Sequence, residues 1–236
     1  MYKINNWGFD KYLAIKIWRK NINLFNRLNE NVLFHNAITK KTSNCIVMQQ
    51  SNWTKENRPD YLTCLVENHT ENEAIDFFEF GVFEGHSILG LAKNHTNPNS
   101  RFFGFDAFDD GYPESWDQHK KGDYASSIPK TNDTRIKFIK GKFQESLDGF
   151  LQTYKPENRL LVHMDADLYS STLYVLTKLD KLFDKKTIVT FDEFGYVDKE
   201  FLAFYDYTRS YYRDYTIIQH IPGCHRVSIK FKFSSS

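Results

Sequence analysis

Residues 77–92 read FFEFGVFEGHSILGLA, and this stretch decides the fold. An apolar run is interrupted by Gly81 and Gly85 and then resumes with the three- and four-residue spacing of a helix. The pattern predicts a strand, a tight turn and a helix. Glycines at such a turn can adopt positive φ and let a ligand approach the backbone, and the first helical turn offers unpaired N–H groups to that ligand.

The turn differs from the G-x-G-x-x-G fingerprint of dinucleotide-binding proteins. It reads E-x-G-x-x-x-G, with Glu79 near the end of the predicted strand, which favours a hydroxyl- or amine-bearing ligand over a pyrophosphate. A second apolar strand, Arg101–Asp106, follows and ends in an acid. Rossmann-type sheets place a ribose-binding carboxylate about 20 residues beyond the glycines. We therefore predict that Asp106 binds a ribose.

The segments EFGVFEGHS and FGFDAFDDGYPESW together resemble the class I S-adenosylmethionine-dependent methyltransferases. Within that class they most resemble the macrocin O-methyltransferases, sugar-modifying enzymes that need a divalent cation. The resemblance covers residues 77–233. It implies a Rossmann-like α/β fold with a mostly parallel seven-stranded sheet, an antiparallel C-terminal hairpin and bound S-adenosylmethionine.

The resemblance also implies a set of cofactor-binding residues. These are Glu79, Gly81, Phe83, Gly85, Ser87, Asp106, Gln144 and Asp165. The first residues of the set surround the methionine part of the cofactor, and Asp106 binds the ribose hydroxyls. Gln144 matches a glutamine that contacts the adenine in metal-dependent catechol-type methyltransferases.

Three acids follow two predicted parallel strands. Asp165 ends the strand at residues 160–164, and Asp192 and Glu193 follow the strand Ile188–Phe191. A predicted helix joins the two strands, so the acids meet at the carboxyl edge of the sheet. Carboxylates gathered there need a cation or raised pKa values, and a hard cation such as Mg²⁺ accepts oxygen ligands. In the resembling family these positions are metal ligands, although the pair is often Asp-Asp. The alternative is that they are strand-end or helix-cap residues.

The implied reaction is methyl transfer to a hydroxyl oxygen by in-line displacement at the sulfonium carbon. The metal, bound by Asp165 among others, would hold, acidify and orient that hydroxyl. The general base stays open, because Leu168 occupies the position of the lysine found in catechol-type enzymes. The candidates are His163, His225, His119 and Tyr169. For His163, a hydrogen-bonded position in the core is the favoured interpretation.

Residues 111–135 form a long aperiodic stretch that predicts a lid over the site. Its Tyr112, Trp116 and Tyr124 suit stacking on a sugar ring or on a flat phenolic acceptor. The expected partner is a small-molecule or carbohydrate acceptor. The alternatives are a metal-free methyltransferase of the same fold, a nicotinamide-dependent oxidoreductase, which the missing fingerprint disfavours, and a non-catalytic binding module.

Length and composition fit one sizeable domain with an extension. The 236 residues are 41% hydrophobic, and we predict a methyltransferase domain at residues 73–236 preceded by a helical arm and cap at residues 1–72. An amphipathic helix at residues 10–29 would contact its own domain, a subunit of a homo-oligomer or a membrane surface.

Charge, hydropathy and cysteine content exclude several classes of protein. A net charge of +1 gives no field that favours nucleic acid. No run of 18 apolar residues is present, so no membrane span is expected. The three cysteines are far apart and odd in number, which argues against a disulfide framework and a zinc site and favours the cytoplasm.

Overall fold

The computed structural model describes residues 33–34, 36–38, 45–48, 58–113, 115 and 119–233. The chain separates into two compact units, Met1–Lys40 and Lys41–Ser236, and the second holds the sheet. The helix predicted at residues 10–29 lies outside the described residues. The domain boundary predicted between residues 72 and 73 stays a prediction.

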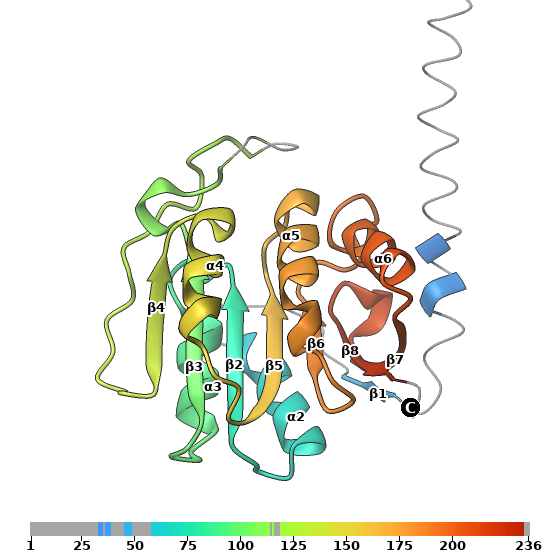
Figure 1. The fold of residues 1–236 in the computed structure, drawn as a ribbon, viewed down its shortest axis with the longest axis horizontal. Helices are drawn as coiled ribbons and strands as arrows, with labels where there is room; N and C mark the ends of the chain where they lie inside the picture. The colour runs from blue at the N-terminus through green and yellow to red at the C-terminus, as the bar shows by residue number, and fades with distance from the viewer. Residues whose placement is uncertain are drawn as a thin grey trace, which may run out of the picture. The chain divides into compact units, whose positions relative to one another are not determined.

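An eight-stranded sheet forms the centre of the second unit (Figure 1). The strands are β1 (Ile46–Val47), β2 (Ile75–Phe80), β3 (Arg101–Asp106), β4 (Ile136–Lys140), β5 (Arg159–Met164), β6 (Ile188–Phe191), β7 (Asp214–His220) and β8 (Val227–Lys232). Their order across the sheet is β1-β7-β8-β6-β5-β2-β3-β4. Only β8 runs against its neighbours, β6 and β7, and every other neighbouring pair is parallel.

The Rossmann-like α/β fold with its antiparallel C-terminal hairpin is confirmed. The strand count is one higher than predicted, because β1 pairs in parallel with β7 at the edge of the sheet. The sequence gives no periodic signal for β1, since two residues are too few to show alternation.

Five helices among the described residues of the second unit flank the sheet. They are α2 (Arg58–His69), α3 (His86–Asn94), α4 (Phe143–Thr153), α5 (Tyr169–Leu179) and α6 (Glu200–Ser210). In Figure 1, α4, α5 and α6 lie on the near face of the sheet, and α2 and α3 lie on the far face. Short 3₁₀ helices follow β3 (Phe108–Asp110), α5 (Asp180–Leu182) and β7 (Pro222–Cys224). The helix α4 begins at Phe143, because the carbonyl of Lys142 already accepts the N–H groups of Glu145 and Ser146.

The central strands are buried on both faces, as expected for a parallel sheet covered by helices. All six residues of β2 are buried. On β2 and β3 the rings of Phe80 and Phe105 stack with centroids 4.7 Å apart, and Phe78 packs edge-on against Phe103. Each buried phenylalanine stabilises the fold by about 1.5–3 kcal/mol. This packing fixes the carboxyl ends of β2, β3, β5 and β6, where the candidate site lies.

No helix among the described residues is long and apolar enough to cross a membrane. Cys45, Cys64 and Cys224 carry free thiols.

Candidate active site

The glycine turn after β2 is set by close backbone packing. Gly81 has a φ of 93°, and a Cβ atom there would lie 1.8 Å from the carbonyl oxygen of Asp165. Only glycine fits this contact between the ends of β2 and β5. Gly85 has a φ of 81° at the start of α3, and a Cβ there would lie 2.8 Å from Cγ of Pro129. Both glycines are therefore required by the backbone path, whatever ligand the turn binds.

Asp106 fastens this turn to the end of β3. Its carboxylate accepts the backbone N–H groups of Val82 at 2.7 Å, Phe83 at 2.9 Å and Phe108 at 2.6 Å. A carboxylate offers about four acceptor positions, so these three bonds leave about one for a ligand. The predicted ribose contact remains a prediction, and Asp106 also has a structural role that the sequence analysis did not foresee.

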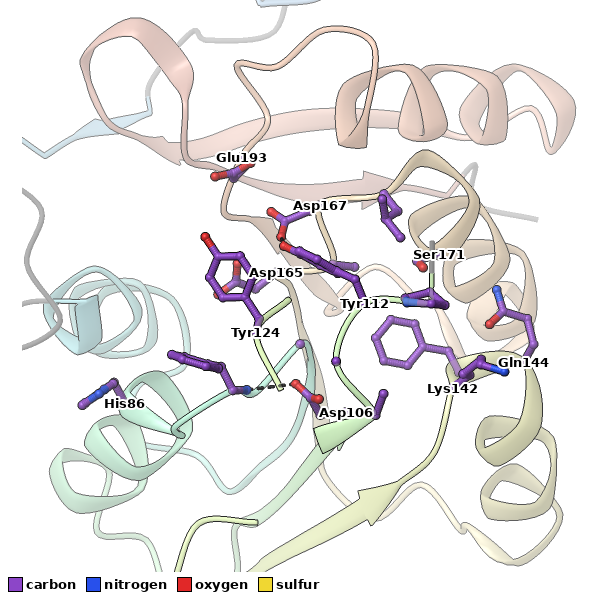
Figure 2. Close-up of a pocket in the computed structure, with 18 residues that line it drawn as sticks. His86, Asp106, Tyr112, Tyr124, Lys142, Gln144, Asp165, Asp167, Ser171 and Glu193 are labelled. Atoms are coloured by element: carbon purple, nitrogen blue, oxygen red, sulfur yellow. Dashed lines mark hydrogen bonds between the residues drawn. The ribbon is translucent and has the colours of Figure 1, made fainter. Parts of the chain in front are cut away.

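A cavity of about 370 Å³ opens above the carboxyl ends of the strands (Figure 2). Its wall includes the glycine turn, the end of β3, the start of α4 and the loop that follows β5. Of the predicted cofactor residues, the cavity is lined by Gly81, Phe83, Asp106, Gln144 and Asp165. The predicted residues outside its lining are Glu79, Gly85 and Ser87.

Glu79 lies inside the sheet rather than in the cavity. Its carboxylate is 2.9 Å from Nδ1 of His163, which is its register partner on β5. Burial alone would lower the pKa of His163, but the carboxylates of Asp192 and Glu79 raise it to about 9. The imidazole is therefore protonated at neutral pH and acts as a buried cation beneath the site. A protonated imidazole cannot accept a proton, which argues against His163 as the general base.

The other base candidates also stand outside the cavity, as far as its described lining extends. The hydroxyl of Tyr169 donates to Asp206 at 2.9 Å. His225 is exposed and its ring lies 5.7 Å from that of Tyr196. His119 belongs to the lid, with its ring centroid 6.0 Å from that of Tyr112.

Acidic side chains gather from two loops and one helix. Asp165, Asp167 and Glu193 line the cavity. Asp192 is buried, and it offers an oxygen within 4.8 Å of ligand atoms on both Asp165 and His163. Glu200, fully buried on α6, accepts the N–H of Ala166 at 3.2 Å and the N–H of Glu193 at 3.1 Å. It thereby holds the two acid-bearing loops together.

Two of these acids, Asp167 and Glu200, were not predicted from the sequence as site residues. Asp167 is the second acid of D-A-D-L-Y, so the motif itself carried the signal. Glu200 lies seven positions beyond Glu193 in a different element, and no local pattern marks it.

Two carboxyl groups of this cluster, those of Asp167 and Glu200, have raised pKa values because of burial and because most of their charged neighbours are acids. Burial, followed by the charges of Glu193 and Asp192, raises the pKa of Asp167 well above its usual value. Burial, followed by Asp167 and Asp165, does the same to the pKa of Glu200. A group of carboxylates gathered at one place fits a hard divalent cation, which prefers oxygen ligands. Asp165, Asp192 and Glu193 could supply these ligands, although Asp192 also forms an ion pair with Arg226.

The lid lies over these acids, as Figure 2 shows for Tyr112 and Tyr124. The hydroxyl of Tyr112 donates to Oδ2 of Asp167, and its ring lies 5.2 Å from that of Tyr124. Further along the lid, Oγ of Ser126 donates to the carbonyl of Phe83 at 2.9 Å. The lid therefore touches both the glycine turn and the acid cluster. Trp116, the third predicted aromatic, lies outside the described residues.

Solved structures share this fold at low sequence identity. A crystal structure of CalS11, described as a calicheamicin methyltransferase, is 21% identical over 72% of this chain and 78% of that one, with a TM-score of 0.58. The O-methyltransferase NovP is 20% identical over 75% and 78%, with a TM-score of 0.51. An O-methyltransferase from Bacillus cereus, solved in complex with SAH, is 15% identical over 85% and 89%, also with a TM-score of 0.51. At these identities the likeness establishes the fold alone.

The sequence itself matches one family model. Residues 78–194, just under half of the chain, match the model Methyltransf_24, described as a methyltransferase domain. No curated protein matches the chain. The matched residues include the glycine turn, Asp106 and the acids from Asp165 to Glu193. Residues 78–194 are thus similar to a methyltransferase domain, and the solved structures share the Rossmann-like fold of the chain.

Proposed function

We propose that this protein transfers a methyl group from S-adenosylmethionine to a hydroxyl oxygen of a sugar or glycosylated small molecule, with help from a divalent cation such as Mg²⁺. One observation carries the proposal. The cavity that contains the glycine turn and Asp106 also contains Asp165, Asp167 and Glu193. A methyl donor and an oxygen nucleophile can therefore meet beside carboxylates.

The cofactor would occupy the part of the cavity between the glycine turn and the start of α4. Gly81 and Phe83 would border its methionine part, and Asp106 would use its remaining acceptor position on the ribose. Gln144, exposed on the first turn of α4, would lie beside the adenine. Glu79 would support the site from below through His163, without touching the cofactor.

The cation would be held by Asp165, Asp192 and Glu193. When bound, it supplies positive charge that orients the acceptor hydroxyl and makes it more acidic. Asp167 is the residue of the described lining that best fits the general base. Its raised pKa makes its carboxylate a stronger base than that of an ordinary aspartate. The hydroxyl proton passes to Asp167, the oxygen forms a bond to the methyl carbon, the carbon–sulfur bond breaks, and S-adenosylhomocysteine leaves.

A sugar acceptor is supported by two features. Tyr112 and Tyr124 present aromatic rings above the acids, and such rings suit stacking on a sugar. In addition, an unliganded structure of CalS11 is described as TDP-rhamnose 3'-O-methyltransferase, at 22% identity over 72% of this chain and 78% of that one, with a TM-score of 0.51. The macrocin-type assignment, a homo-oligomer through the N-terminal helix and a cytoplasmic location stay predictions.

The experiment is a methyl-transfer assay on the purified protein with S-adenosylmethionine and a panel of nucleotide-linked sugars, glycosides and catechols. We expect methylated sugar by mass spectrometry, loss of turnover in excess EDTA and recovery on adding Mg²⁺. Full turnover in EDTA would favour the metal-free alternative. Binding of NAD instead of S-adenosylhomocysteine would favour an oxidoreductase. Ligand binding without turnover on any acceptor would favour a binding module.

A further inference from the structure

Arg226 is a buried cation that contacts the acid cluster from the far side of the cavity. It precedes β8, and only 5% of the residue is exposed. Its Nη2 atom forms an ion pair with Oδ1 of Asp192, and both side chains are 6% exposed. Nothing in the proposed reaction uses this residue.

The surroundings of Asp192 differ from those of its neighbour Glu193. Glu193 lines the cavity, whereas Asp192 is buried and stands outside its lining, beside Arg226. The ring of His163 is also close, with Nε2 at 3.8 Å from Oδ1 of Asp192. The backbone N–H of Asp192 is bonded to the carbonyl of Met164 at 2.9 Å, so the main chain cannot swing outward without breaking that bond.

A divalent cation bound at this cluster would need the same carboxylate that Arg226 holds. A guanidinium carries a fixed positive charge, and two like charges on one carboxylate repel each other. We propose that Arg226 is a positioning residue that competes with the divalent cation for Asp192 and thereby sets the affinity of the cluster for metal. The inference rests on the metal-assisted part of the proposed function.

The structure also shows how Arg226 would stay in place when a cation takes Asp192. The guanidinium carbon lies 5.3 Å from the centre of the Tyr61 ring, a distance at which the ring attracts a cation. Tyr61 itself is fixed on α2, because its hydroxyl lies 2.9 Å from Oγ of Ser228 and donates to the carbonyl of Gln219 at 3.2 Å. Arg226 thus has a second favourable contact that does not involve the acids.

The test is a titration of the metal-free protein with Mn²⁺, in which electron paramagnetic resonance measures the free ion. The titration gives the Mn²⁺ affinity without any need for turnover. Arg226→Gln removes the competing charge and should bind Mn²⁺ at least about tenfold more tightly than wild type. Arg226→Lys keeps the charge but loses the forked geometry, and should be intermediate, about threefold tighter. Arg213→Gln removes another ion-paired arginine, 2.7 Å from Asp180, and should leave Mn²⁺ affinity unchanged.

Folding of each variant is checked by thermal unfolding and by S-adenosylhomocysteine binding. If Arg226→Gln does not fold, Arg226→Lys decides the question alone. Equal or weaker Mn²⁺ binding by the folded Arg226 variants overturns the inference, as does the absence of Mn²⁺ binding in both wild type and variants. Methyl transfer by wild type in excess EDTA is measured separately. Full turnover there would remove the metal from the proposed function without changing what the Mn²⁺ titration says about Arg226.

Discussion

The carboxylates at the two ends of the central parallel strands have different neighbours. At the amino end, Asp76 on β2 is completely buried, and Arg101 donates to it through Nε at 2.8 Å and through Nη2 at 2.5 Å. Tyr154 adds a hydrogen bond of 2.6 Å. At the carboxyl end, Asp167 and Glu200 are surrounded mainly by other acids.

The pKa directions follow from these partners. Burial alone would raise the pKa of Asp76, but hydrogen bonds from Arg101, Tyr154 and Asn158 outweigh it and lower the pKa. For Asp167 and Glu200, burial and neighbouring carboxylates act in the same direction and raise the pKa. Burial therefore does not decide whether a carboxylate stabilises the fold; its partners do. The amino end of the sheet is arranged for stability, whereas at the carboxyl end, where ligands bind, Asp167 and Glu200 are kept beside other acids.

The largest expected effect is at the amino end. Asp76→Asn should lower the free energy of unfolding by about 3–5 kcal/mol, because it leaves the partly buried Arg101 without its main counter-charge. Urea unfolding followed by circular dichroism measures this. Glu157→Gln is the control, since Glu157 is the exposed partner of the same arginine at 2.8 Å and its loss should change stability by less than about 1 kcal/mol. Similar losses in the two variants would contradict the contrast between the two ends.

At the carboxyl end, substitution of an acid should lower turnover rather than the stability of the fold. Asp165→Asn should lower kcat at least about 100-fold, because under the proposed function it removes one of the carboxylates that would hold the cation beside the acceptor. Its unfolding free energy should stay near that of wild type. Asp109→Asn serves as the control, since Asp109 is an exposed acid paired with Lys140 at 2.6 Å. If Asp165→Asn unfolds readily and keeps its kcat, the assignment of roles to the two ends is wrong.

Asp106 is an intermediate case, a carboxylate at the carboxyl edge that backbone N–H groups satisfy. Asp106→Ala should weaken S-adenosylhomocysteine binding by about 1.5–3 kcal/mol, measured by calorimetry. Because the carboxylate also holds Val82 and Phe83, hydrogen exchange should become faster in residues 81–86 even without ligand. Unchanged affinity with faster exchange would limit Asp106 to its structural role.

The smallest expected effect is a change in the pH dependence of stability. A carboxyl group whose folded pKa is raised contributes stability that is present below its unfolded pKa of about 4 and is lost as pH rises through the folded pKa. Wild type without metal should therefore lose stability above pH 4 through Asp167, and Asp167→Asn should reduce that loss. At pH 7 in EDTA the variant should be about 1 kcal/mol more stable than wild type. Asp76, with its lowered pKa, acts in the opposite sense and loses its contribution as pH falls below about 4.

Features of the fold and of the site could be predicted from the sequence where they depend on residues close together in the chain. The strands that end at the candidate site were predicted because each carries a continuous apolar run, and the glycine turn was predicted because Gly81 and Gly85 bracket it. The total of seven strands came from the family resemblance. The side on which Glu79 lies was not predictable, since a strand buried on both faces gives no alternation to show which face meets the ligand. The contacts of Glu200 and Arg226 with the acid loops arise from residues distant in sequence, and only the folded chain brings them together.

Gly81 has a consequence for the design of variants under the proposed function. A Cβ atom at this position would lie 1.8 Å from the carbonyl oxygen of Asp165, so the glycine turn and the loop after β5 pack against each other with no room for a side chain. Any larger residue there would displace both segments at once, which under the proposed function would couple the placement of the methyl donor to that of Asp165. Tyr112 and Tyr124 approach from a separate segment, so we expect new acceptors to be reached best by exchanging lid residues around an unchanged Gly81.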